Sequence, residues 1–289
     1  MNHPINMSIT PNFAIISQRV LTPKGERPAA ILIQEEKIMD VVSISEISSD
    51  CPVEDMKNDV VMPGLVDTHV HINEPGRTDW EGFETATKAA AAGGITTLVD
   101  MPLNCIPVTT TVDALNQKIA ATKNQLWVDC GFYGGLIPDN LQDIESLADA
   151  GVLGFKAFLS HSGIDEFPNI NEKHLREALP IFANKGIPIL VHAELENGAT
   201  QSEDHSTYKS FQDSRPKSWE NNAVKLLIQL SKEFDARIHI VHLSSADILA
   251  EIAQTRNDGY PISVETCPHY LHFSSDRKST RLNSSHTSI

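Results

Sequence analysis

Two histidines placed two residues apart are the first feature that could do chemistry. His69 and His71 stand at the end of the apolar run 64–70. Such a run is typical of a buried strand, in which side chains two apart point the same way. Both imidazoles can therefore reach one metal ion, although two histidines held by ordinary hydrogen bonds would give the same pattern. The turn predicted at Pro75-Gly76 places the pair at the mouth of the sheet.

A lysine inside an apolar run is the second unusual feature. Lys156 lies in Gly-Phe-Lys-Ala-Phe-Leu, and an isolated buried ammonium is costly. The lysine could be salt-bridged at a strand end. It could also react with carbon dioxide to give a carbamate, whose anionic oxygens can bridge two cations. Together with His69 and His71, the carbamate is the better interpretation.

Two more histidines end later apolar runs. His192 ends the run 187–192, and His242 lies near the end of the run 237–243. Each alone could be structural, but side chains at the carboxyl ends of barrel strands face a common centre. A binuclear metal site is therefore predicted from five residues: His69, His71, Lys156, His192 and His242. Imidazole with oxygen donors suits zinc, and cobalt, manganese or iron also fit.

A few polar residues near the same strand ends are candidates for substrate contacts. Asn73 follows the histidine pair, Asn104 follows the second apolar run, and His161 lies in the loop after Lys156. His239 is left out, because strand alternation should turn it away from the face that carries His242.

Seven apolar runs alternate with helical patterns from residue 63 onward. The predicted strands are 64–70, 95–100, 127–133, 152–159, 187–192, 237–243 and 262–267, and the predicted helices are 82–92, 112–123, 141–150, 172–185, 219–234 and 246–256. This alternation predicts a parallel sheet covered by helices, either an open doubly wound sheet or a closed (β/α)8 TIM barrel. No Gly-x-Gly-x-x-Gly follows any run, and the polar residues come from the ends of several strands. Both observations favour the barrel.

The two ends of the chain differ in sequence pattern from this middle part. Residues 1–62 carry short β-type runs and polar turns, which predict a small β module that packs on the barrel of residues 63–273. Residues 274–289 are rich in Ser and Thr without apolar periodicity and cannot form an eighth strand. They are expected to be a disordered tail or, preferably, an artefact joined to a truncated reading frame, because a barrel missing one strand leaves two open edges.

Composition excludes several classes of partner. The 289 residues carry a formal net charge of −15, which disfavours nucleic acid and anionic membrane surfaces. No run approaches the length of a membrane span, and the first residues do not form a signal peptide. Four widely spread cysteines indicate free thiols in a reducing compartment, so a cytoplasmic location is expected.

Four segments in this order resemble the cyclic amidohydrolases of the amidohydrolase superfamily: Asp67-Thr-His-Val-His, Gly154-Phe-Lys-Ala-Phe, Leu190-Val-His-Ala-Glu and Val241-His-Leu-Ser-Ser. Within that group, the segment Ile-Asn-Glu-Pro-Gly-Arg-Thr-Asp-Trp-Glu-Gly-Phe of residues 72–83 is most similar to allantoinases. The resemblance covers about residues 10 to 273. It implies a metal-dependent (β/α)8 barrel with a small β-sandwich. It also implies opening of the hydantoin ring of the small molecule allantoin to give allantoate in purine breakdown, and a homotetramer.

The resemblance also implies roles for the five ligand candidates. His69, His71, carbamylated Lys156, His192 and His242 match the ligands of the two metal ions. In that family an aspartate after the eighth strand moves a proton from the attacking hydroxide to the leaving nitrogen. That aspartate is absent from the seven strands found here. The chain is therefore expected to be C-terminally truncated and inactive or barely active.

Three other readings remain open. Dihydroorotase would carry an arginine two residues after the second histidine, where this chain has Asn73, although Arg77 is close by. Hydantoinase or dihydropyrimidinase fits the ligands but not the segment around Asn73. A non-catalytic scaffold usually has its ligand positions replaced, whereas all five are intact here.

Overall fold

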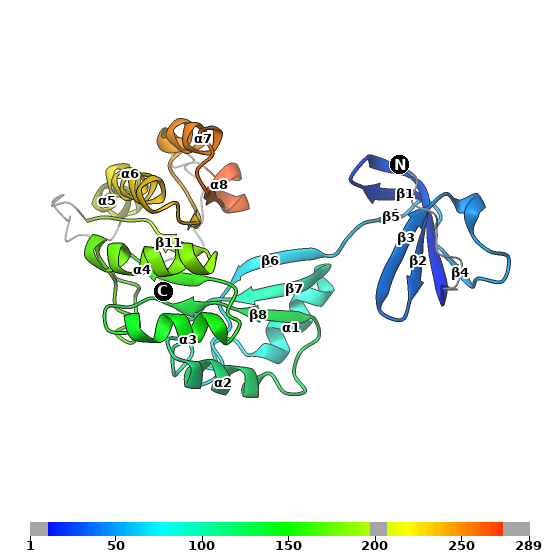
Figure 1. The fold of residues 1–289 in the computed structure, drawn as a ribbon, viewed down its shortest axis with the longest axis horizontal. Helices are drawn as coiled ribbons and strands as arrows, with labels where there is room; N and C mark the ends of the chain where they lie inside the picture. Colours follow the sequence, from blue (N-terminus) through cyan, green and yellow to red (C-terminus); the bar gives the residue numbers. More distant parts are fainter. Residues whose placement is uncertain (1–10, 197–206, 274–289) are drawn as a thin grey trace. The chain divides into compact units, whose positions relative to one another are not determined.

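The computed structural model describes residues 11–196 and 207–273, and Figure 1 shows them as a ribbon. The chain divides into two compact units, Met1–Leu65 and Val66–Ile289. The last sixteen residues, on which a tail was predicted, lie outside the described residues.

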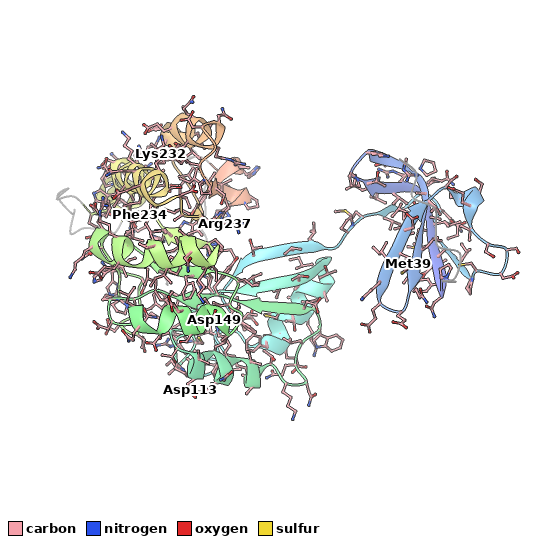
Figure 2. All side chains as sticks on the ribbon, in the orientation of Figure 1. Met39, Asp113, Asp149, Lys232, Phe234 and Arg237 are labelled. Carbon is pink, nitrogen blue, oxygen red and sulfur yellow. The ribbon has the colours of Figure 1, made fainter. Side chains whose placement is uncertain are left out.

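The first unit is a five-stranded sheet. Its strands are β1 (Phe13–Thr22), β2 (Gly25–Gln34), β3 (Lys37–Val42), β4 (Val53–Asp55) and β5 (Val60–Val61). The order is β3-β2-β1-β4, with β5 paired to β1. A tight turn before Gly25 joins β1 to β2. The side chain of Met39 on β3 is exposed (Figure 2). The structure describes one sheet within residues 11–65, so the second layer of a sandwich stays a prediction.

Parallel strands form the framework of the second unit. They are β6 (Leu65–Val70), β7 (Ile95–Asp100), β8 (Asp129–Phe132), β9 (Gly134–Gly135), β10 (Phe155–Phe158), β11 (Ile189–His192), β12 (Ile238–Ile240) and β13 (Ile262–Val264). Two parallel sheets result, β6-β7-β8 and β13-β12-β11-β10-β9. Because β9 follows β8 after one residue, the chain passes directly from one sheet to the other. Each of the seven predicted runs contains a strand, and the predicted parallel pairing is confirmed.

Helices follow most of the strands, as the alternation predicted. They are α1 (Phe83–Ala92), α2 (Val112–Ala121), α3 (Ile144–Asp149), α4 (Glu172–Lys185), α5 (Tyr208–Ser214), α6 (Lys217–Phe234), α7 (Leu249–Asn257) and α8 (Pro268–His272). The helix α4 has the predicted bounds. It begins where the Asn171 side chain accepts hydrogen bonds from two backbone N–H groups, and it ends at Gly186 with φ of 64°. The short helices α5 and α8 were not predicted.

Alternate side chains along the strands point to opposite faces of the sheet. Phe155 and Ala157 of β10 pack with Leu179 and Phe182 of α4 in the main hydrophobic core. The residues between them point to the opposite face of the sheet. The outer surface of the helices is polar, and on it Lys185 pairs at 2.6 Å with Asp149, which Figure 2 labels. The helix-facing side chains of β10 are therefore buried against α4, and the opposite face of the strand is left for the site.

The cysteines and the helices bear on two further predictions. All four cysteines are free thiols, as their spacing predicted. Among the described residues, no helix has the length and apolar character needed to cross a membrane.

Candidate active site at the strand ends

The five predicted ligand residues come from four strands or from the residues directly after them. His69 lies near the end of β6 and His71 just beyond it, Lys156 lies in β10, His192 ends β11, and His242 follows β12 by two residues. Lys156 is in register with Leu190, and Phe158 with His192. In a parallel sheet, side chains in register share a face, so these residues point away from the helix-covered core.

The four imidazoles are neighbours. Ring centroids of His69 and His71 are 5.5 Å apart, those of His69 and His242 are 5.6 Å apart, and those of His192 and His242 are 4.8 Å apart. Nδ1 of His192 lies 3.2 Å from Nε2 of His242. Residues far apart in sequence are thus brought together at one end of the strands.

Lys156 is buried beside these rings. Its side chain is 1% exposed, and Nζ has no hydrogen-bond partner. The amine lies 4.8 Å from the centroid of the Phe158 ring, which in turn stacks on His192 at 4.9 Å. Burial lowers the pKa of Lys156 to about 7, and only the carboxylate of Glu265 opposes this.

Burial also lowers the pKa values of three of the histidines, which favours their neutral forms. It lowers the pKa of His71 to about 3, with help from the positive charges of His69, Lys156 and Lys118. Burial and then the Lys156 charge bring the pKa of His242 well below its usual range. Burial lowers the pKa of His192 as well, against the hydrogen bond with Glu194. Neutral imidazole is the form that binds metal ions.

Two carboxylates that the sequence did not single out hold these histidines. Oε1 of Glu265 lies 2.5 Å from Nδ1 of His69, and Oε2 of Glu194 lies 3.2 Å from Nε2 of His192. Arg215 contacts both carboxylate oxygens of Glu194 at 3.2 Å. The sequence contained a signal for each of them. Glu265 directly follows the seventh strand, and Glu194 lies two residues after His192.

The strand-alternation argument that turned His239 away from this face does not hold in the structure. Its Nε2 lies 3.3 Å from Oε2 of Glu265, and its Nδ1 lies 2.8 Å from Oγ of Ser263. Strand alternation breaks down because His242 has φ of 40°, so the backbone turns and both histidines approach the same site. Glu265 therefore links His239 to His69. Burial alone would raise the pKa of Glu265, but the hydrogen bonds of both histidines hold it well below its usual range.

The three candidate substrate residues differ in placement. Asn73 and Asn104 are 7% and 5% exposed, and Oδ1 of each has no hydrogen-bond partner. Their loops touch, because Ile106 N donates to Pro75 O at 2.7 Å. His161 is exposed, and its contacts are with Gly163 and Asp165 in its own loop.

Arg77 fastens these loops together. Its guanidinium donates to Asn104 O at 2.9 Å and to Oε1 of Glu166 at 2.8 Å, and it lies 5.1 Å from the centroid of the Trp80 ring. The loops after β6, β7 and β10 are thereby joined by one side chain. The charge of Arg77 is already paired with a carboxylate.

The donor atoms are of the types that bind metal ions, but they do not surround a single point. Within residues 11–196 and 207–273, no three His, Cys, Asp or Glu side chains converge as a ready metal site. The histidines adjoin in pairs instead, and a lysine completes the set. Unpartnered buried nitrogen atoms on Lys156 and His71 are atoms that a ligand or a modification would satisfy.

Residues 60–280 match the family model described as Amidohydrolase family. The chain belongs to the amidohydrolase family. Members with similar sequences include an allantoinase from Streptomyces avermitilis, 49% identical over 258 residues, which covers 88% of this chain and 58% of that protein. An allantoinase from Saccharomyces cerevisiae is 42% identical over 275 residues, which covers 89% of this chain and 60% of that protein.

A solved structure is also similar to this chain. The L-hydantoinase (dihydropyrimidinase) from Arthrobacter aurescens has a TM-score of 0.81 and 31% identity, covering 91% of this chain and 60% of that one. The chain thus spans a little under two thirds of the length of the relatives that it matches. The predicted resemblance to allantoinases and to the wider family is confirmed.

Proposed function

We propose that the whole protein is a metal-dependent cyclic amidohydrolase that opens the hydantoin ring of allantoin to give allantoate. The observation that carries this proposal is the Lys156 amine, buried without a partner beside four adjoining imidazoles. A buried amine is costly to keep in a fold unless it is paired or chemically altered. The similarity to allantoinases from a bacterium and a yeast supports a small-molecule substrate of this kind.

The metal ligands would be His69, His71, Lys156, His192 and His242. Two divalent ions, zinc above all, suit imidazole and oxygen donors. Neutral Lys156 would add to carbon dioxide and release one proton, which gives a carbamate whose single negative charge is shared by two oxygen atoms. The lowered pKa of Lys156, about 7, supports this step because the amine must be neutral to react. Bound there, the metal ions would polarise the ring carbonyl and make water nucleophilic near neutral pH.

The protein's own residues would orient and bind. Glu265 and Glu194 accept the ring hydrogens of His69 and His192, which fixes the ring nitrogens left for metal. Asn73 would bind the substrate through its buried amide, since a ureide carries both N–H donors and carbonyl acceptors. Asn104 and His161 stay as further candidate contacts, and Asn104 is the better supported because it is buried and unpaired.

The pairing of Arg77 bears on the choice of substrate. Dihydroorotase needs a cation for the substrate carboxylate. The Arg77 guanidinium is already hydrogen-bonded to Glu166 and to a backbone carbonyl. Asn73 is neutral. Both observations favour a substrate with an uncharged ring. A hydantoinase is the second candidate, favoured by the similarity to the L-hydantoinase structure.

We also propose that the parallel strands belong to a closed (β/α)8 barrel. The contact between His69, on β6, and Glu265, just after β13, supports closure because it joins the first strand to the seventh. The fold of the L-hydantoinase relative is in keeping with this arrangement. The homotetramer, the cytoplasmic location and the division into residues 1–62 and 63–273 stay predictions.

Metal analysis and a substrate comparison test the proposal. The purified 289-residue chain should contain close to two divalent ions, and Lys156→Met should contain fewer. The whole protein should open allantoin faster than hydantoin or dihydroorotate, and a chelator should abolish the reaction. A metal content near zero would favour a non-catalytic scaffold, and faster opening of hydantoin would favour the second candidate.

A further inference from the structure

A fully buried ion pair lies next to the candidate site. Asp100 ends β7 and Lys118 lies in α2, and both side chains are 0% exposed. The Lys118 ammonium donates to Oδ2 of Asp100 and, at 3.0 Å, to Met101 O. Such a pair costs desolvation energy on both sides and is weak evidence for stability by itself. Another role is therefore worth seeking.

The second oxygen of the carboxylate binds the chain that carries the histidines. Oδ1 of Asp100 accepts a hydrogen bond from Ile72 N at 2.6 Å. Ile72 directly follows His71, at a point where β6 has already ended. One residue along, Met101 N donates to Val70 O at 2.8 Å. The end of β7 thus holds the backbone on both sides of His71.

His71 has special need of this backbone support. The rings of His69 and His192 are each held by a carboxylate, Glu265 and Glu194. Nδ1 of His71 is buried and has no hydrogen-bond partner. The position of this ring therefore depends on the backbone at residues 70–72.

We propose that Asp100 and Lys118 form a positioning pair that fixes the backbone at Ile72 and so aims His71 at the metal ion. This inference rests on the proposed function, in which His71 is a metal ligand. Lys118 holds the Asp100 carboxylate in place through Oδ2, and the carboxylate holds Ile72 N through Oδ1. Partners that orient a metal-binding histidine typically change metal affinity 10-fold to 100-fold when they are replaced.

The electrostatics of the pair agree with this arrangement. Burial raises the pKa of Asp100 to about 6, against the pull of Lys118. Burial alone would lower the pKa of Lys118, but Asp100 and Cys105 together outweigh burial and the pKa is raised. The hydrogen bonds that Asp100 accepts from Lys118 and from Ile72 N suit a carboxylate paired with an ammonium. Removing one charge leaves the other buried and unpaired, so single variants need a neutral double variant beside them.

Metal affinity of the 289-residue chain tests the pair, with Zn²⁺ and Co²⁺ as probes. Asp100→Asn and Lys118→Met should weaken Zn²⁺ binding by about 10-fold or more in competition with a chromophoric chelator. They should also alter the visible spectrum of bound Co²⁺, which reports ligand geometry. The double variant Asp100→Asn with Lys118→Gln should recover most of the affinity. Its two amides can still accept from Ile72 N, bond each other and donate to Met101 O.

A destabilised control separates positioning from general loss of stability. Leu179→Ala removes a buried side chain of α4 on the helix-facing core and should lower stability while leaving metal affinity and the Co²⁺ spectrum unchanged. Wild-type affinity in Asp100→Asn, or an equal loss in Leu179→Ala, would overturn the positioning role alone. If the wild-type chain bound no metal, the proposed function would fall and this inference with it.

Discussion

Glu265 offers the sharpest test of how the histidines are oriented. Its Oε1 lies 2.5 Å from Nδ1 of His69, and its Oε2 lies 3.3 Å from Nε2 of His239. If His69 is a metal ligand, Glu265 fixes which of its ring nitrogens faces the metal ion. Replacing Glu265 should therefore weaken metal binding without removing any ligand.

The expected size of the effect follows from the contact. Replacing a residue that orients a ligand costs about 10-fold to 100-fold in metal affinity, or roughly 1.4 to 2.8 kcal/mol. The loss of metal affinity in Glu265→Ala should lie at the upper end of this range, because the ring of His69 then loses its hydrogen-bond partner. Glu265→Gln should lie nearer the lower end, since its amide oxygen can still accept from one histidine.

Competition titration of the purified chain with a chromophoric chelator measures both variants. Ser263→Ala is the matched control, because it removes the other hydrogen bond of His239 and leaves His69 untouched. Its affinity should stay within about threefold of wild type. Wild-type affinity in Glu265→Ala would refute the reasoning, and so would a loss in Ser263→Ala as large as that in Glu265→Ala.

Three further outcomes are expected. In the whole protein, for which allantoin opening is proposed, Arg77→Met should lower kcat/KM for allantoin by about 100-fold through loosened loops, with unchanged metal content. Arg176→Met, which removes an exposed paired arginine of α4, should leave kcat/KM unchanged, and an equal fall would contradict the role of Arg77. Lys156→Met should bind less metal by elemental analysis, and full metal content would count against the carbamate. After a chelator has removed metal from both proteins, Lys156→Met should unfold at the same or a higher urea concentration than wild type, because it buries no amine. Gly76→Ala should lower the urea midpoint more than Gly94→Ala. Both have positive φ, but only at Gly76 would Cβ meet another side chain, at 2.6 Å.

Much of the framework could be predicted from the sequence because it depends on local patterns. The helix at 172–185 was predicted with its observed bounds, since Asn171 and Gly186 mark its ends. The predicted strands placed His69, His192 and His242 at or near strand ends, and in the structure the rings of His69 and His192 each lie beside the ring of His242. Lys156 stood out because an amine in an apolar run is chemically unusual.

The features that could not be predicted from the sequence depend on contacts between residues far apart in the chain. Glu265 lies 196 residues after His69, and nothing local distinguishes it from other carboxylates that follow a strand. His239 was excluded on a rule that holds for a regular strand and fails where His242 adopts a positive φ. The Asp100 partner lies on the following helix, so its charge could not be matched from spacing alone.

The interleaving of residues along β10 has a practical consequence for engineering this protein. Phe155 and Ala157 face the helices, whereas Lys156 and Phe158 face the histidines. Thermostability libraries can therefore vary one set of positions while the other stays untouched. Deletion of a single residue in this segment would exchange the two sets, and the same event would spoil both the interior and the chemistry.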